Sequence, residues 1–171
     1  MRIAIVGNSG SGKSTLAGQL AHEHGLGWLD LDTVAWEPGK IAVAREPRAA
    51  LAQVREYCST TPRWVVEGCY AGLIHATLDE ADLLLFLDPG ALACRANCHS
   101  RPWEPHKFRS PQEQDRHFDK LLDWVDSYYR RDGDASLQEH QAVFDAFEGR
   151  KQKLSRRVTP EFVSALCLQT I

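Results

Sequence analysis

The chain has 171 residues, of which 20 are Lys or Arg and 23 are Asp or Glu, so its formal net charge is −3 at pH 7. Hydrophobic residues make up 43% of the sequence and charged residues 25%, which is ordinary for a globular protein and excludes the disordered and collagen-like classes. The length predicts a single domain over residues 1–171. A slightly acidic chain is a poor candidate for a nucleic-acid coat, although a basic patch at residues 150–157 leaves a nucleic-acid partner open.

The number of cysteines and the length of the apolar runs indicate the cellular compartment of the protein. An odd number of cysteines cannot all pair within one chain, which favours reduced thiols and a cytoplasmic location; the five are Cys58, Cys69, Cys94, Cys98 and Cys167. The apolar runs at residues 3–6 and 83–87 are too short for a signal-peptide core or a membrane span. We therefore expect no membrane partner.

The first half of the chain alternates short apolar strands with helices. Strands are predicted at residues 2–6, 28–31, 63–66 and 83–87, with helices starting at Lys13 and Pro47 and a short helix over residues 71–78. These strands are apolar throughout rather than alternating, which predicts a parallel sheet covered on both faces. Trp28 and Trp64 are expected to be core residues of adjacent strands.

The second half is predicted to be mostly helical. Ser110-Pro111-Gln112-Glu113 and Ser136-Leu137-Gln138-Glu139 are capping boxes, each of which opens a helix. The first of these helices is predicted to continue through Tyr128 and to end at Asp132-Gly133. A weak strand at residues 151–154 and a final helix after Thr159-Pro160 complete the chain.

Residues 7–15 match the phosphate-binding pattern G-x-x-x-x-G-K-[ST] and lie between a predicted strand and a predicted helix; they are Gly7, Asn8, Ser9, Gly10, Ser11, Gly12, Lys13, Ser14 and Thr15. The glycines let backbone N–H groups turn toward phosphate oxygens, and the helix start adds its positive end. We expect Lys13 to reach the β- and γ-phosphates and Ser14 to ligate Mg²⁺. This motif predicts binding of a nucleotide, with ATP and Mg²⁺ as the expected ligands.

Absent motifs narrow the class of nucleotide-binding protein. The sequence has no N-K-x-D signature, no aspartate followed three residues later by glycine, and no LSGGQ motif, which disfavours GTPase and ABC classes. The chain then resembles the nucleotide-kinase branch of P-loop proteins, which includes adenylate, shikimate and gluconate kinases. The segments RIAIVGNSGSGKSTLA, LDLDTVAW, RWVVEGCY and ADLLLFLDPG look most like the adenylate-kinase-related DNA topology modulation proteins.

The resemblance implies an α/β fold: a three-layer P-loop NTPase domain with a five-stranded parallel sheet in the order 2-3-1-4-5. It also implies ATP·Mg²⁺ as phosphoryl donor and an arginine-bearing helical lid, which we expect within residues 91–134.

Acidic residues follow two of the predicted strands. Alternate residues of an extended strand point the same way, so Asp30 and Asp32 could face one cleft. In similar kinases the second acid of such a pair orients the acceptor hydroxyl or a Mg²⁺-bound water, so Asp32 is the predicted catalytic acid and Asp30 an acceptor-site residue. Glu67 resembles the acid of the D-G step in adenylate kinases, which would hold a Mg²⁺-bound water beside Ser14. Two solvated strand-end acids are the alternative for the pair, and Asp88 is either a functional acid or a turn former.

Arginines and one tryptophan complete the predicted site. Arg45 and Arg48 could clamp an acceptor phosphate or carboxylate, or simply be solvated, and Trp36 could line the acceptor pocket. Arg130 and Arg131 are the preferred lid pair, because they follow a helix and precede a glycine, although compensation of the helix dipole also explains them. The other lid candidates are Arg95, Arg101 and Arg109.

Two further clusters have simpler explanations. Cys94, Cys98, His99 and His106 suggest zinc, but their spacing is incomplete for a zinc site, and core-facing cysteines are the better interpretation. The basic residues Lys151, Lys153, Arg156 and Arg157 are interpreted as a solvated face.

These patterns support two functional hypotheses. The first is an enzyme, a P-loop kinase that transfers a phosphoryl group from ATP to a small-molecule or nucleotide acceptor. The alternative is an ATP-binding regulatory NTPase that hydrolyses ATP slowly and acts through a protein or nucleic-acid partner.

Overall fold

The computed structural model describes residues 1–37, 43–104 and 108–168, without the side chains of residues 160, 167 and 168. Within these residues one sheet of five parallel strands has the order β2-β3-β1-β4-β5, as predicted. The strands are β1 (Arg2–Gly7), β2 (Gly27–Asp30), β3 (Trp64–Gly68), β4 (Leu83–Leu87) and β5 (Arg150–Leu154).

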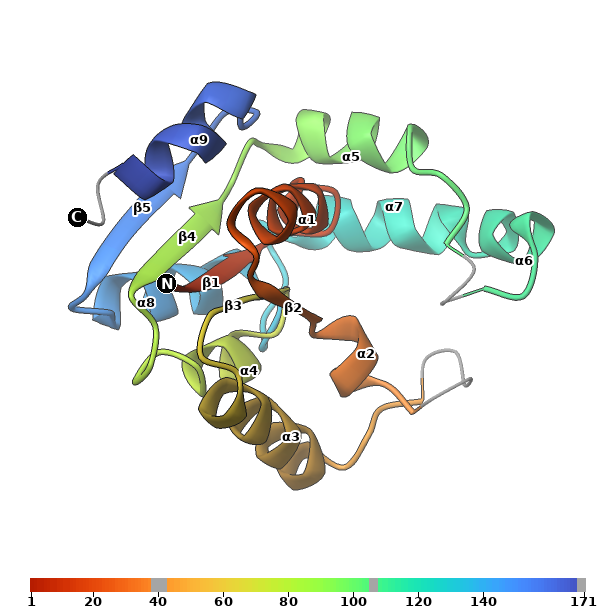
Figure 1. The fold of residues 1–171 in the computed structure, drawn as a ribbon. Coiled ribbons are helices and arrows are strands. Elements are labelled where there is room, and N and C mark those ends of the chain that lie inside the picture. Colours follow the sequence, from red (N-terminus) through yellow and green to blue (C-terminus); the bar gives the residue numbers. More distant parts are fainter. Residues whose placement is uncertain (38–42, 105–107, 169–171) are drawn as a thin grey trace.

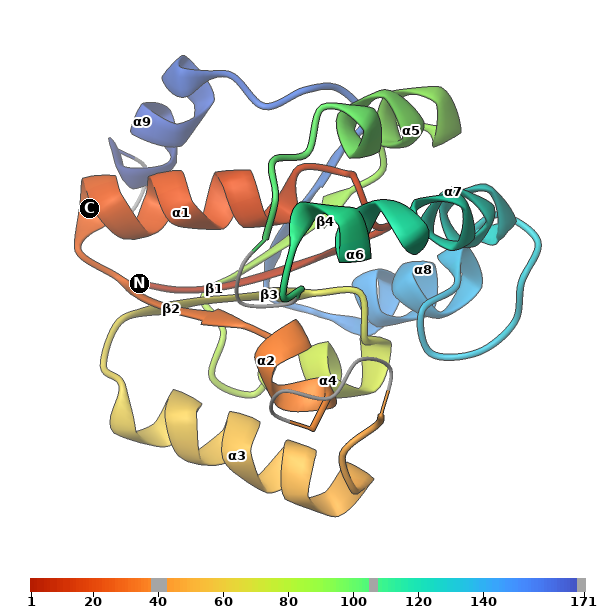
Figure 2. The same cartoon turned by 90° about the vertical axis from the view of Figure 1, so that its right-hand side faces the viewer.

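Helices cover both faces of the sheet (Figures 1 and 2). One face carries α1 (Lys13–His24) and α9 (Pro160–Leu168), and the other carries α3 (Pro47–Thr60), α4 (Ala71–His75) and α8 (Leu137–Ala146). Beyond the carboxyl ends of the strands lie α2 (Asp32–Ala35), α5 (Ala91–His99), α6 (Pro111–Arg116) and α7 (Phe118–Ser127). None of the helices in the described ranges combines the length and the apolar character that crossing a bilayer requires.

The central strands are buried because side chains of both pleat directions meet a helical layer. Along β1, Ile3 and Ile5 pack toward α1 and α9, whereas Ala4 and Val6 pack toward the α3–α4–α8 layer. Trp64 is fully buried, as expected, but the prediction for Trp28 was wrong, since its side chain is 46% exposed. The reason is topological, because β2 is an edge strand of the sheet.

Both predicted capping serines are confirmed, but the reciprocal bond of a full capping box is not formed at Ser110, because the Glu113 carboxylate accepts from the Arg109 backbone N–H instead; the helix after Ser110 is also shorter than predicted. Ser110 and Ser136 each accept a hydrogen bond at 3.2 Å from the backbone N–H three residues later. The predicted single helix is split in two at His117, whose backbone N–H bonds to the carbonyl of Gln114 and whose ring nitrogen donates to that of Glu113. Its second part, α7, ends at Ser127 rather than at Asp132-Gly133.

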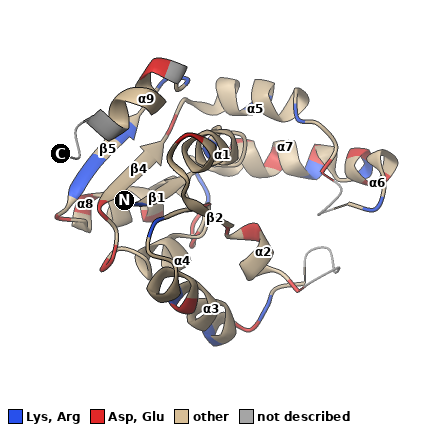
Figure 3. Ribbon diagram, in the orientation of Figure 1, with Lys and Arg blue, Asp and Glu red and all other residues tan. Residues whose placement is uncertain are grey.

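The basic strand β5 is an edge strand, and it stands out in Figure 3 as a run of Lys and Arg. Lys151 donates to the carbonyls of Phe144 and Asp145 at 2.8 and 2.9 Å, at the carboxyl end of α8. Lys153 pairs with Asp88 at 3.3 Å. Lysines on an edge strand also discourage pairing with another chain, so this cluster has a structural explanation.

A buried histidine joins three of the elements at the carboxyl end of the sheet. His140 of α8 is fully buried, and its Nε2 lies 3.0 Å from the carbonyl oxygen of Cys69, just after β3. A carbonyl can only accept, so Nε2 carries the proton and Nδ1 accepts from the Tyr128 hydroxyl at 2.8 Å. Burial lowers the pKa of His140 from 6.5 to about 4, which keeps the ring neutral.

This network predicts a loss of stability on acidification. Between pH 6.5 and pH 4 the unfolded chain binds a proton that folded His140 does not, so the free energy of unfolding should fall by about 3 kcal/mol over this window. Urea unfolding of wild type and His140→Gln near pH 7 and about pH 4.5 measures the effect. The variant should have a lower free energy of unfolding than wild type near pH 7. Its free energy of unfolding should fall much less on acidification than that of wild type. The matched control is His22→Gln at an exposed position; an equal acid loss in wild type and His140→Gln would contradict the prediction.

Candidate functional site

The phosphate-binding loop connects β1 to α1 at the carboxyl edge of the sheet. Gly10 and Gly12 have φ values of 75° and 95°, which only glycine adopts readily. A Cβ atom on Gly10 would also lie 2.3 Å from the carbonyl oxygen of Cys94, so any side chain there would collide with α5. No side chain caps the start of α1, which leaves the N–H groups of its first turn available for an anion.

The predicted nucleotide-binding side chains differ in how they are held. Lys13 is 8% exposed and donates from Nζ to the carbonyl oxygen of Asn8 at 2.9 Å, whereas Ser14 and Thr15 are exposed. The Asn8 side chain donates to the carbonyl of Val125 at 3.0 Å and accepts from the Ser9 amide at 2.8 Å. Asn8 thereby fixes the loop to α7 without using its side chain for a ligand.

The cysteines of α5 pack behind the loop as core residues. Cys94 and Cys98 are buried with Leu122 and Val125 of α7, and burial raises the pKa of the Cys94 thiol to about 11. Within the described ranges no three His, Cys, Asp or Glu residues group as a metal site, and His106 lies outside those ranges.

Glu67 lies at the end of β3, beside the loop. Its side chain is 2% exposed, and its Cα pairs in register with Ile5 of β1 and with Asp30 of β2. Burial raises the pKa of Glu67 to about 7; Lys13 and Ser14 act in the opposite direction, and the nearby carboxylates add to the rise. Its Oε1 atom is buried with no hydrogen-bond partner in the structure, which is unusual for a carboxylate oxygen.

The implied magnesium ion fits these residues. Mg²⁺ takes oxygen ligands and is usually held by one or two carboxylates together with phosphates and water. The Ser14 hydroxyl and the unpartnered Oε1 of Glu67 offer such oxygens on neighbouring elements. We therefore treat Ser14 and Glu67, with Asp32 nearby, as the residues that would hold this ion directly or through water.

The two aspartates are close together, but not for the reason that the sequence suggested. β2 ends at Asp30 and Asp32 begins α2, so the two do not alternate along one extended strand. Instead the Asp30 carboxylate accepts a hydrogen bond from the Asp32 backbone N–H at 2.9 Å, which turns the chain. Both carboxylates still lie near enough to Glu67 to raise its pKa.

Tyr70 is a site residue that the sequence analysis did not assign. Its hydroxyl donates to Oδ1 of Asp32 at 2.7 Å and accepts from Nε1 of Trp36 at 2.8 Å. The Trp36 and Tyr70 rings meet edge to face, with centroids 6.4 Å apart. The only sequence signal was its position three residues after Glu67, which gives no indication of a partner 38 residues away.

Most of the predicted arginines are bound to neighbouring groups. The Arg45 side chain is hydrogen-bonded to Gln53 on α3, and Arg48 is exposed. Arg95 forms an ion pair with Asp126, and Arg101 with Glu104 at 3.2 Å. Arg109 is exposed, and its backbone N–H bonds to Glu113.

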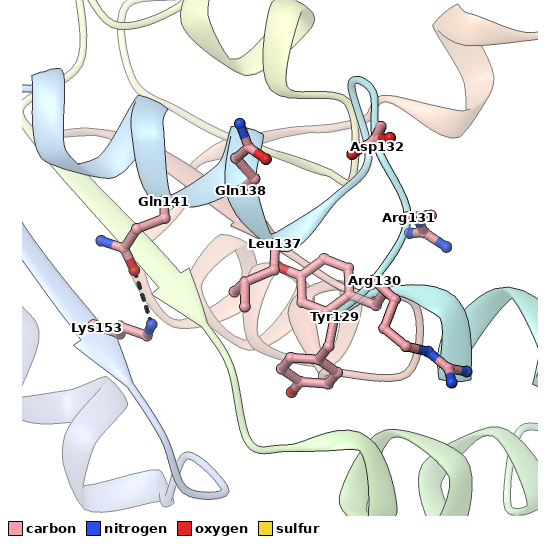
Figure 4. A pocket seen from close by; sticks show the side chains of 9 residues that line it. Tyr129, Arg130, Arg131, Asp132, Leu137, Gln138, Gln141 and Lys153 are labelled. Carbon is pink, nitrogen blue, oxygen red and sulfur yellow. Dashed lines mark hydrogen bonds between the residues drawn. The ribbon is translucent and has the colours of Figure 1, made fainter.

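The structure separates the roles of Arg130 and Arg131. The Arg131 guanidinium stacks 3.5 Å above the Trp124 ring and donates to the carbonyl of Ala135 at 2.9 Å. Exposed Arg130 lines a cavity of about 320 Å³ between the end of α7, α8 and β5, opposite Lys153 (Figure 4).

Asp88, at the end of β4, is held by two side chains. It accepts from the Tyr129 hydroxyl at 2.6 Å and pairs with Lys153 of β5 at 3.3 Å. Asp88 therefore ties the segment after α7 to β5, and the predicted turn at residues 88–90 is not formed.

Comparisons with known proteins identify the fold. No family model and no curated protein matches the sequence. A sugar kinase from Janibacter sp. HTCC2649 is 17% identical over 98% of this chain and 91% of its own, with a TM-score of 0.55. A shikimate kinase from Bacteroides thetaiotaomicron is 14% identical over 99% of this chain and 96% of its own, with a TM-score of 0.60. A shikimate kinase from Aquifex aeolicus is 14% identical over 98% of this chain and 94% of its own, with a TM-score of 0.52. This chain has the P-loop kinase fold that these proteins share.

Proposed function

We propose that this protein is a kinase that transfers the γ-phosphoryl group of ATP to a hydroxyl of a small-molecule or nucleotide acceptor. The observation that carries the proposal is the grouping of Asp30, Asp32 and Glu67 beside Lys13 and Ser14 of the phosphate-binding loop. Phosphoryl transfer needs cations for the phosphates and acids for the metal and the acceptor, and both sets are present. A loop that only bound a nucleotide would have no use for Asp32 on the acceptor side.

On the nucleotide side, the uncapped amides at the start of α1 would bind phosphate oxygens, and Lys13 would exchange the Asn8 carbonyl for the β- and γ-phosphates. Magnesium, when bound, supplies positive charge to the β- and γ-phosphate oxygens. Ser14 and Glu67 would hold this ion, because Glu67 is 2% exposed and its carboxyl group interacts with Lys13 and Ser14 of the loop.

On the acceptor side, Asp32 would orient the hydroxyl and take its proton. The acceptor oxygen forms a bond to the γ-phosphorus while the bond from that phosphorus to the β,γ-bridging oxygen breaks, and ADP leaves with the electron pair. Tyr70 donates a hydrogen bond to Asp32 and so fixes its carboxylate, and Trp36 would line the acceptor pocket. Asp30 supports Asp32 through the backbone N–H bond.

The helices after β4 would close over the reacting groups. Residues 91–134 contain α5, α6 and α7, and we propose that they act as the lid of a single domain spanning residues 1–171. Arg130, which is exposed, and Arg131, once released from Trp124, would bring positive charge to the transferring phosphoryl group.

The first prediction from this proposed function concerns the reaction class. With ATP and millimolar Mg²⁺, at least one acceptor from a panel of nucleosides, nucleoside monophosphates, sugars, sugar acids and shikimate should raise ATP consumption well above the rate with water alone. Slow hydrolysis that no acceptor changes would contradict a kinase and favour the regulatory NTPase, for which a partner would then be sought.

The second prediction concerns Lys13. Lys13→Ala should lower turnover by roughly 100-fold or more, because the side chain is the loop's cation for the transferring phosphoryl group. Steady-state kinetics measure the loss, and thermal unfolding should show a folded protein. Arg55→Ala, at an exposed position of α3, is the control and should behave as wild type; a folded and fully active Lys13→Ala protein would rule out this mechanism.

The third prediction concerns Glu67. Glu67→Gln should raise the Mg²⁺ concentration for half-maximal activity by about tenfold, because an amide oxygen is a weaker ligand than a carboxylate. A magnesium titration at saturating ATP measures the shift, with Glu56→Gln on exposed α3 as the control. An unchanged magnesium requirement in Glu67→Gln would exclude Glu67 from the metal site.

A further inference from the structure

Tyr70, which holds the Asp32 carboxylate, lies in the short β3–α4 connection, residues 69 and 70. It occupies the N-cap position of α4, but its side chain makes no capping bond to that helix, and its hydroxyl donates instead to Oδ1 of Asp32. The first N–H groups of a helix have no partner within the helix and must find one elsewhere. Since α4 has only five residues, its position depends on contacts with other elements.

Asp134, in the segment that joins α7 to α8, supplies the partners that α4 needs. Its backbone carbonyl accepts from the Ala71 N–H at 3.0 Å, and its Oδ1 atom accepts from the Gly72 N–H at 2.6 Å. A hydrogen bond from a backbone N–H to a carboxylate is assisted by charge and is stronger than a neutral one. A Cβ atom on Gly72 would lie only 3.2 Å from Oδ1, which shows how closely the two segments approach. An exposed carboxylate 62 residues away in sequence therefore caps α4.

The β3–α4 connection is held on its other side by His140. The Nε2 atom of His140 donates to the carbonyl of Cys69 at 3.0 Å, so the chain is hydrogen-bonded both before and after Tyr70. Asp134 is also the last residue of the proposed lid, residues 91–134, and it follows Gly133, whose φ is 89°. The carboxyl end of the proposed lid is therefore bonded to the connection that carries Tyr70.

We propose that Asp134 is a positioning residue for the phosphoryl acceptor. It fixes the β3–α4 connection, the connection places Tyr70, and Tyr70 orients the Asp32 carboxylate that would bind the acceptor hydroxyl. This inference rests on the proposed kinase function and connects the end of the proposed lid to the acceptor side of the same site. A simpler role, in which Asp134 only stabilises α4, predicts lower stability without any change at Tyr70 or in the use of the acceptor.

The indole N–H signal of Trp36 in a proton–nitrogen NMR spectrum reports where Tyr70 lies, because this N–H donates to the Tyr70 hydroxyl at 2.8 Å. Trp36→Phe identifies the signal, and Tyr70→Phe gives its position when the bond is absent. We expect Asp134→Ala to move the signal toward its position in Tyr70→Phe. Asp134→Asn should stay near wild type, because its amide oxygen can still accept from Gly72. An unmoved signal in Asp134→Ala would overturn the proposal.

Steady-state kinetics with the acceptor found in the panel measure the consequence for the reaction. Asp134→Ala should lower kcat/KM for the acceptor by about tenfold and leave KM for ATP near its wild-type value, because a displaced carboxylate slows transfer without changing the phosphate-binding loop. Asp82→Ala is the matched control. This exposed carboxylate also accepts from a distant backbone N–H, that of Arg2 at 2.7 Å, but at the amino edge of the sheet. Thermal unfolding should show that both variants are folded.

The outcomes separate this inference from the proposed function. If wild type is an active kinase, unchanged acceptor kinetics in Asp134→Ala, or an equal loss in Asp82→Ala, would overturn this inference and leave the kinase intact. Consumption of ATP by wild type that no acceptor raises would overturn the proposed function, and Asp134 would then have no acceptor to position.

Discussion

The pairing of β3 between β1 and β2 is the constraint on which the site depends. Parallel strands bring their carboxyl ends to one edge, so this register sets Glu67 beside the strand that leads into the phosphate-binding loop and beside Asp30. A shift of one residue would turn Glu67 into a helical layer and bring Val66 to its place. The register is fixed by apolar burial, since β3 and β1 pack against helices on both faces.

The buried Glu67 carboxyl is destabilising by itself, and the proposed function would account for its presence. A carboxyl group that is 2% exposed, with one oxygen lacking a hydrogen-bond partner, costs free energy that an apolar side chain would not. Lys13 offsets part of this cost and lies on the adjoining loop. The magnesium ion of the proposed function would give this oxygen the partner that it lacks.

The parts of the fold that depend on neighbouring residues in the sequence could be predicted from the sequence alone. Short sequence patterns were enough to predict three kinds of element. They are the glycines and lysine of residues 7–15, the apolar run of β4 and the serines that cap α6 and α8. The order of the strands came instead from the resemblance to known kinases. Trp28, Tyr70 and the stacking of Arg131 on Trp124 could not be predicted, because each depends on a neighbour that only the tertiary fold supplies.

The phosphate-binding loop is joined to the helices beyond the sheet by hydrogen bonds. Asn8 bonds to the carbonyl of Val125 in α7, and Asn97 of α5 donates to that of Gly10 at 2.8 Å. Gly10 also has no room for a side chain against the carbonyl of Cys94, so the loop backbone packs directly against α5. The lysine that would bind phosphate rests on Asn8, the same residue that anchors α7. Lys13 contacts the backbone carbonyl of Asn8, whereas the Asn8 side chain holds α7, so the loop and the proposed lid meet at this residue through two separate groups.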